Sequence, residues 1–150
     1  MADRVAQICA ERGVRFTPLR RVAFEALLAF NGPAGAYDLI RALQLRLGKH
    51  VAPPTAYRAL EFLQEQGFVT WIETRNAFLP SSHPEDRNLG AFLLRDHCGA
   101  TVEVEFPELD AEFACWAKAL GFRVGRRVVE LQGTCAECQG ESAPPEKGRA

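Results

Sequence analysis

The sequence predicts an α+β fold in two parts, a helical first half closed by a β-hairpin and a small α/β second half. Apolar residues recur at helical spacing as far as Gly67 and alternate in short runs after it. Charge divides the chain in the same way. Residues 1–68 hold nine Lys and Arg against six Asp and Glu, a net charge of +3, whereas residues 69–150 carry −4. Two domains with different tasks are therefore expected.

Three helices are expected before Gly48. The first covers Asp3 to Arg12, with Val5, Ile8 and Cys9 on its inner face. Thr17-Pro18 has the pattern of an N-cap followed by proline at the first helical position, and that helix ends at Asn31-Gly32-Pro33. The third helix runs from Tyr37 to about Leu45.

A fourth helix, from Pro53 to Gly67, has a packed back and a polar front. Ala56, Ala59, Leu60 and Leu63 have the spacing of one buried face, while Thr55, Tyr57 and Arg58 fall on the other. Two strand-like runs follow, Val69–Ile72 and Ala77–Leu79. Helices followed by such a hairpin indicate a winged helix-turn-helix in residues 1–80. The polar front suits insertion into a DNA major groove, although an amphipathic surface helix would show the same pattern.

The second half begins after a polar, turn-rich hinge at residues 81–90. Residues 91–139 predict strands at Ala91–Leu94, Thr101–Phe106 and Arg123–Leu131, with a helix from Glu108 to Leu120. The aromatic residues of that helix are expected in the core. Three strands and one helix cannot bury both faces of a sheet, so we expect a dimerisation domain and a homodimer. Residues 140–150 predict a disordered tail.

Composition excludes several other classes of protein. The chain contains no run of eighteen apolar residues, so we expect no membrane partner, and Met1-Ala2-Asp3-Arg4 leads into a helix without a signal-peptide core. We therefore expect a cytoplasmic protein. Its three histidines are far apart, and no nucleophile–base pair or phosphate loop is evident. An enzyme is not expected.

Five cysteines in such a protein favour a metal or redox site over a disulfide framework. Cys135 and Cys138 form a C-x-x-C pair, and Cys98 precedes a glycine in a turn. Cys9 and Cys115 lie in apolar helical patterns and are expected to be buried and inert.

In order along the chain, these motifs resemble the ferric uptake regulator family of metal-responsive transcription factors, and its zinc uptake regulator branch in particular. The resemblance runs from about Arg12 to Cys138. It is carried by the following segments: Arg15-Phe16-Thr17-Pro18-Leu19-Arg20-Arg21, Pro54-Thr55-Ala56-Tyr57-Arg58-Ala59-Leu60-Glu61-Phe62-Leu63, Asn76-Ala77-Phe78, His97-Cys98-Gly99-Ala100 and Gly133-Thr134-Cys135-Ala136-Glu137-Cys138. It implies a homodimeric repressor that binds a double-stranded DNA operator.

The DNA-reading residues of the family are kept. Tyr57 and Arg58 match the Tyr-Arg pair of its recognition helix, where an arginine can donate two hydrogen bonds to a guanine edge. We expect the DNA-binding set to be Thr55, Tyr57, Arg58, Arg15, Arg20 and Arg75. For Arg20, a solvated helix face is the alternative to a phosphate contact.

The family's structural zinc is bound by two C-x-x-C pairs, and this chain has Arg95 where one cysteine is expected. Cys98, Cys135 and Cys138 remain, and we expect them to lie together. Three thiolates can hold zinc if His97, Asp96 or water completes the tetrahedron. A guanidinium has no lone pair to offer a metal and could instead replace the metal's charge beside the thiolates.

The regulatory zinc site is more strongly altered. The resemblance places its four ligand positions at Thr70, Ser81, Asn88 and Glu103, and only Glu103 is a good ligand, with His83 nearby. Weakened or lost zinc sensing is therefore expected. Two alternatives remain open: a thiol redox switch that uses the three cysteines, and a dimerising partner of an intact paralogue.

Overall fold

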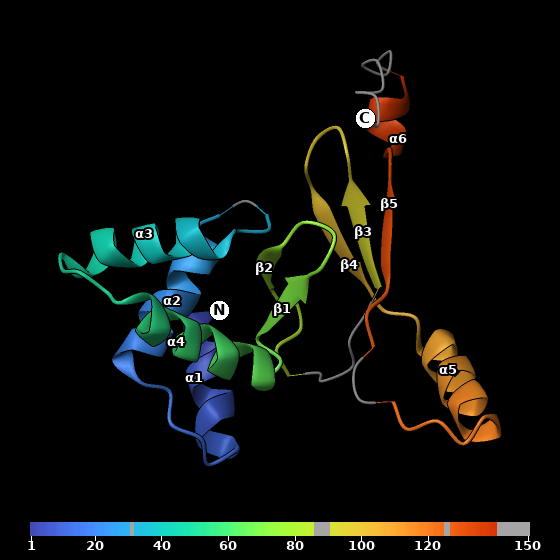
Figure 1. Cartoon of the computed structure of the whole chain (residues 1–150), viewed down its shortest axis with the longest axis horizontal. Helices are drawn as coiled ribbons and strands as arrows, with labels where there is room; N and C mark the ends of the chain where they lie inside the picture. Colours follow the sequence, from blue (N-terminus) through green and yellow to red (C-terminus); the bar gives the residue numbers. More distant parts are fainter. Residues whose placement is uncertain (31, 86–90, 125–126, 141–150) are drawn as a thin grey trace.

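The computed structural model describes residues 1–30, 32–85, 91–124 and 127–140. The first half contains helices α1 (Ala2–Glu11), α2 (Pro18–Leu28), α3 (Ala36–Leu47) and α4 (Pro53–Glu65), followed by the hairpin strands β1 (Val69–Ile72) and β2 (Ala77–Pro80). The predicted winged helix-turn-helix is thereby confirmed (Figure 1).

Local sequence signals set the helix ends. The Thr17 side chain accepts a hydrogen bond from the Arg20 amide and caps α2, as predicted. Gly67 follows α4 with a φ of +76°, a left-handed conformation that glycine adopts without steric cost. The predicted back of α4 is buried, and it packs with α1, α2 and α3 on one continuous core. Burial of Val5, Ile8 and Cys9 on α1 is also confirmed.

The second half contains strands β3 (Ala91–Arg95), β4 (Thr101–Val104) and β5 (Glu130–Gly133), with α5 (Pro107–Ala119) and a short helix α6 (Ala136–Gln139) that the sequence analysis missed. The strand order is β4-β3-β5, with β4 antiparallel and β5 parallel to β3. Figure 1 shows α5 beyond one end of this sheet and α6 at the other.

Two predicted strands are shorter than expected. Thr101–Phe106 ends as a strand at Val104, and Arg123–Leu131 becomes a strand only at Glu130. In the described residues, β3 begins at Ala91, which pairs with Val104, and Phe92 pairs with Glu130 and donates to the Val129 carbonyl. Residues 125 and 126 of the second predicted strand lie outside the described residues.

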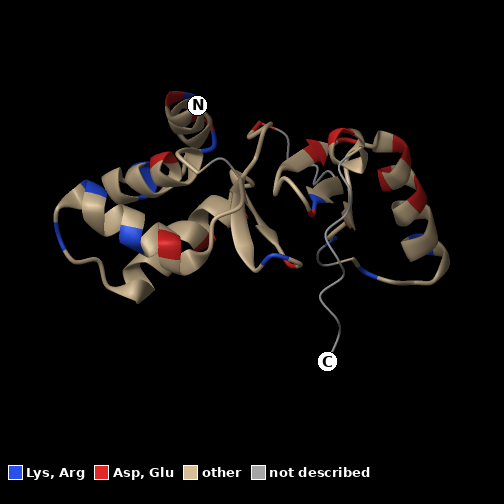
Figure 2. Ribbon diagram, turned by 90° about the horizontal axis from the view of Figure 1, so that it is seen from above, with Lys and Arg blue, Asp and Glu red and all other residues tan. Residues whose placement is uncertain are grey.

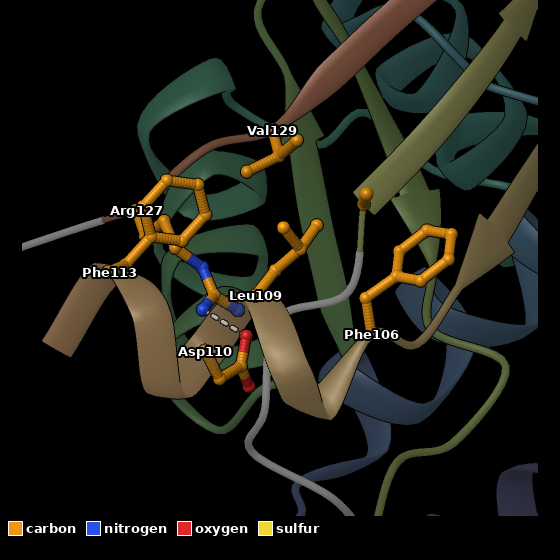
Figure 3. Close-up of a pocket in the computed structure, with 7 residues that line it drawn as sticks. Phe106, Leu109, Asp110, Phe113, Arg127 and Val129 are labelled. Atoms are coloured by element: carbon orange, nitrogen blue, oxygen red, sulfur yellow. Dashed lines mark hydrogen bonds and ion pairs between the residues drawn. The ribbon is translucent and has the colours of Figure 1, made fainter. Parts of the chain in front are cut away.

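Two further predictions about α5 are wrong. None of its side chains is buried, and Trp116 is 57% exposed although its aromatic residues were expected in the core. Cys115 on the same helix is exposed, not buried. Near its start, α5 faces the segment before β5, where the Asp110 carboxylate pairs with Arg127 beside Phe113 (Figure 3). Farther along the helix, Trp116 is left exposed by the residues that the structure describes.

Part of the predicted hinge, residues 86–90, and the predicted tail from residue 141 lie outside the described residues. Within the described ranges, the helices are too short and too polar to cross a membrane.

Candidate nucleic-acid interface and cysteine site

The front of α4 presents the predicted recognition residues to solvent. Thr55, Tyr57 and Arg58 are all exposed, and Tyr57 retains 44% of its accessible surface. Ala56 and Ala59 on the opposite side are buried, which fixes the rotation of the helix about its axis. The helix therefore offers one aromatic, one hydroxyl and one guanidinium group on a single exposed face, a set that can bond to base edges and phosphates.

Arg20, in the first turn of α2, reaches a residue of α4. Its guanidinium carbon is 3.5 Å from the centroid of the Phe62 ring, and its Nη1 donates to the Arg15 carbonyl. Phe62 is buried on α4, so this stacking ties α2 to the recognition helix. Arg15 itself is exposed. Its position on the segment before α2 leaves its charge available to a phosphate.

The structure places Arg75 away from these residues, at the tip of the hairpin. Its guanidinium donates to the carbonyl of Gly99, in the turn between β3 and β4, and, at 2.8 Å, to the carbonyl of Arg95, the last residue of β3. Contact of Arg75 with DNA stays a prediction, and its donors have protein partners in this arrangement.

The three predicted cysteines do come together. The Sγ atoms of Cys98, Cys135 and Cys138 all lie within 4.8 Å of one another. Cys98 lies in the turn after β3. After β5, Cys135 is the residue immediately before α6, and Cys138 lies within that helix. The parallel pairing of β3 and β5 brings their ends to one edge of the sheet, which is why residues 37 and more positions apart meet here.

Arg95 lies beside this cluster, as the sequence indicated. A hydrogen bond to Cys98 and the nearby Cys135 raise the pKa of Arg95, and Glu137 lies 3.4 Å from its Nη1. The Ala100 backbone amide and then Arg95 lower the pKa of Cys98. In contrast, hydrogen bonding with Cys135 raises the pKa of Cys138 to about 11.

This donor set fits three of the four positions of a tetrahedral zinc site. Among the described residues, neither His97 nor Asp96 is close enough to the three cysteines to form a four-ligand group with them. The Asp96 carboxylate instead accepts a hydrogen bond from Gln132 at 2.8 Å. A fixed cation, Arg95, occupies the place of the missing thiolate and favours negative charge on Cys98.

The two candidate ligands of the regulatory site have separate partners. A Glu103 carboxylate oxygen accepts from the Ser82 amide at 2.8 Å, and His83 Nδ1 lies 3.4 Å from Glu105. Within the described ranges, no third His, Cys or carboxylate joins them in a cluster. Of the other predicted positions, Ser81 is buried and accepts from the His83 amide, whereas Asn88 lies outside the described residues.

The fold and these sites define a two-domain winged-helix protein with a cysteine cluster on its second domain. No protein-family model matches the chain. It is 35% identical over 133 residues to the zinc uptake regulation protein of Escherichia coli, covering 88% of this chain and 77% of the relative. The chain therefore belongs to the ferric uptake regulator family, in which the zinc uptake regulators form a branch, as the sequence motifs predicted.

Solved structures agree with this assignment. A zinc uptake regulator complexed with zinc and DNA matches at 33% identity and a TM-score of 0.85, with 93% of each chain covered. The holo form of the regulator XcZur matches at 36% identity and a TM-score of 0.86, covering 93% of this chain and 96% of the other. The apo form of XcZur matches at 37% identity with a TM-score of only 0.52, over 92% and 95% of the two chains.

Proposed function

We propose that the protein is a cytoplasmic transcription repressor that binds a double-stranded DNA operator as a homodimer and responds weakly or not at all to zinc. The DNA-binding proposal rests on α4. Its exposed face presents Thr55, Tyr57 and Arg58, and its opposite face is buried in the core. The likeness to a zinc- and DNA-bound regulator supports it. Catalysis is not part of the proposal.

A second copy of the chain accounts for the exposed apolar surface of the second domain. The large apolar side chains left exposed there are Leu93, Phe106, Leu109, Trp116, Leu120, Phe122, Val124, Val128 and Leu131. Surface this apolar marks a protein interface, and a symmetric dimer buries the same patch on both copies. We propose that α5 and the open face of the sheet form the dimer interface.

Loss of zinc sensing follows from the donor groups at the hinge. Zinc regulatory sites need three or four His, Cys or carboxylate ligands at about 2.0–2.3 Å. His83 and Glu103 supply two, and Glu103 accepts a backbone hydrogen bond. A ligand can shift a conformational equilibrium only through its differential affinity for the two states. Weak zinc binding at this site would therefore produce little change in DNA affinity.

The test is DNA binding with and without zinc. An operator is first selected from random duplexes with the purified protein, and its affinity is then measured in chelator and in micromolar zinc. We expect a change of less than about tenfold, or 1.4 kcal/mol. A hundredfold gain in zinc would contradict the proposal, and restoring ligands with Ser81→Cys and Asn88→His provides the positive control.

A thiol redox switch is the second candidate, favoured by the proximity of Cys98, Cys135 and Cys138. Two of these thiols would lose two electrons and two protons to a peroxide, which is reduced to water or to water and an alcohol, and their sulfurs would form a disulfide. Treating the protein with peroxide and then with dithiothreitol tests this. Reversible loss of operator binding supports the switch, and unchanged binding with a disulfide found by mass spectrometry excludes it.

A further inference from the structure

The turn at the tip of the hairpin, residues 73–76, makes two sets of hydrogen bonds with the second domain. On one side, Arg75 donates to the carbonyls of Arg95 and Gly99 and lies 3.4 Å from Thr101 Oγ1. These acceptors belong to the end of β3, to the turn between β3 and β4, and to the start of β4. The guanidinium fork thus spans a turn in the other domain, a geometry that a flexible ammonium group would not reproduce.

On the other side, one carboxylate accepts three hydrogen bonds from the same hairpin turn. Glu130, the first residue of β5, accepts from the Glu73 amide at 2.7 Å, from the Thr74 amide at 2.9 Å and from the Thr74 hydroxyl. Hydrogen bonds to an ionised acceptor are about twice as strong as those between neutral groups. We call the contacts of Arg75 and Glu130 the wing clamp.

The linker after the hairpin is also tied to the second domain. The Ser82 amide donates to Glu103, and His83 lies beside Glu105, both acids being on or just after β4. Arg12, at the end of α1, donates to the Gln66 carbonyl at 2.7 Å and stacks over Phe68, with the Pro84 carbonyl 3.4 Å away. Glu103, the one good ligand among the four positions that the family resemblance assigns to the regulatory site, is thus occupied by a contact with the linker.

The domain arrangement matches this network. The chain superposes closely on the holo and DNA-bound regulators, and much less well on the apo form of XcZur, at nearly equal identity to both forms. We propose that the wing clamp holds the winged helix in the DNA-binding arrangement, so that hydrogen bonds from Arg75 and Glu130 position the domain without a metal ion at the hinge. This rests on the proposed function and assigns Arg75 and Glu130 as positioning residues.

The proposal is tested on the full-length dimer in chelator, without DNA, by small-angle X-ray scattering. The variants are Glu130→Ala, Arg75→Ala and the double variant, with Glu11→Ala as a control that removes the same charge as Glu130→Ala from an exposed site on α1, outside the proposed dimer interface. We expect the clamp variants to expand relative to the unmodified protein and to Glu11→Ala. We also expect them to bind the selected operator at least about tenfold more weakly, a loss of 1.4 kcal/mol.

Two measurements separate positioning from other roles. Thermal unfolding of the winged helix should be unchanged in both single variants, because neither side chain is part of its core. Scattering and operator affinity that are both unchanged in the double variant would overturn the clamp. A loss of affinity in Arg75→Ala with unchanged scattering would show that Arg75 contacts DNA and would overturn its assignment. If the unmodified protein selects no operator, the proposed function fails, while the scattering still tests the clamp.

Discussion

The two halves of this chain bury their apolar residues in different ways. The winged helix has a core shared by four helices and the hairpin, with Phe24, Leu27, Leu39 and Leu43 fully buried. In the described residues of the second half, Phe92 and Leu94 form a small buried cluster with Ile72 of the hairpin. Three acids of the second half, Glu108, Asp110 and Glu112, lie on α5, and Figure 2 shows acidic residues along this helix. Among the described residues, the large core therefore lies within the first half, whereas the small cluster of the second half includes a residue of the hairpin.

The largest expected effect is a core substitution in the winged helix. Phe24 is completely buried, so Phe24→Ala removes an aromatic ring and leaves a cavity. We expect the free energy of unfolding to fall by about 3–5 kcal/mol. Urea denaturation followed by circular dichroism measures this. Leu45→Ala, at a site that is 77% exposed, is the control and should change stability by less than about 0.5 kcal/mol. Equal effects of the two substitutions would refute the proposed core.

The next prediction concerns a substitution that should stabilise the second half. It restores the cysteine that Arg95 replaces at the cysteine site. Arg95→Cys supplies the fourth thiolate beside Cys98, Cys135 and Cys138. Zinc content should rise toward one ion per chain, and free zinc at a hundred times its dissociation constant should stabilise the fold by about 2.7 kcal/mol. Elemental analysis and calorimetry measure both quantities. Arg95→Ala removes the guanidinium without adding a ligand and should gain less. One tightly bound zinc in the unmodified protein would contradict the prediction.

Specific DNA binding, which we assign to the first half, should be separable from the stability of both halves. Arg58 is exposed on α4, so Arg58→Ala should leave the melting temperature unchanged. Specific operator binding should weaken by about 1–3 kcal/mol, with relaxed base preference. Arg15→Ala is the comparison, because loss of a phosphate contact should weaken all duplexes alike and reduce the salt dependence. Normal footprinting of the operator by Arg58→Ala would show that α4 is misassigned.

The smallest effect concerns the surface that the second half leaves exposed. Trp116→Ala removes a side chain that is 57% exposed in one chain, so it should cost little within the monomer. We expect the dimer to weaken by at least about 1 kcal/mol, or fivefold in its dissociation constant. Sedimentation equilibrium measures this, and Tyr37→Ala, an exposed aromatic of the winged helix, is the control. A dimer that is insensitive to Trp116 would move the interface elsewhere.

The sequence by itself determined the four helices of the first half, the hairpin and which face of α4 is buried. Buried positions such as Ala56 and Leu60 repeat at the helical period, and local signals such as Thr17 and Gly67 mark the helix ends. These features depend on neighbours a few residues apart, and periodicity and capping report such neighbours directly. The family motifs added the expectation that Cys98 meets Cys135 and Cys138.

Only the tertiary structure decided which distant groups face each other. The contact of Arg75 with DNA stays a prediction, and two of its acceptors within the chain are backbone carbonyls, which every residue carries and no sequence pattern marks. No sequence pattern marked Glu130 as a contact residue, because it accepts hydrogen bonds from backbone amides of a turn more than fifty residues earlier. Trp116 has the spacing of a core residue, yet a helix pattern reports that a face is apolar and not whether the same chain covers it. Here the covering layer belongs to another molecule in the proposed dimer.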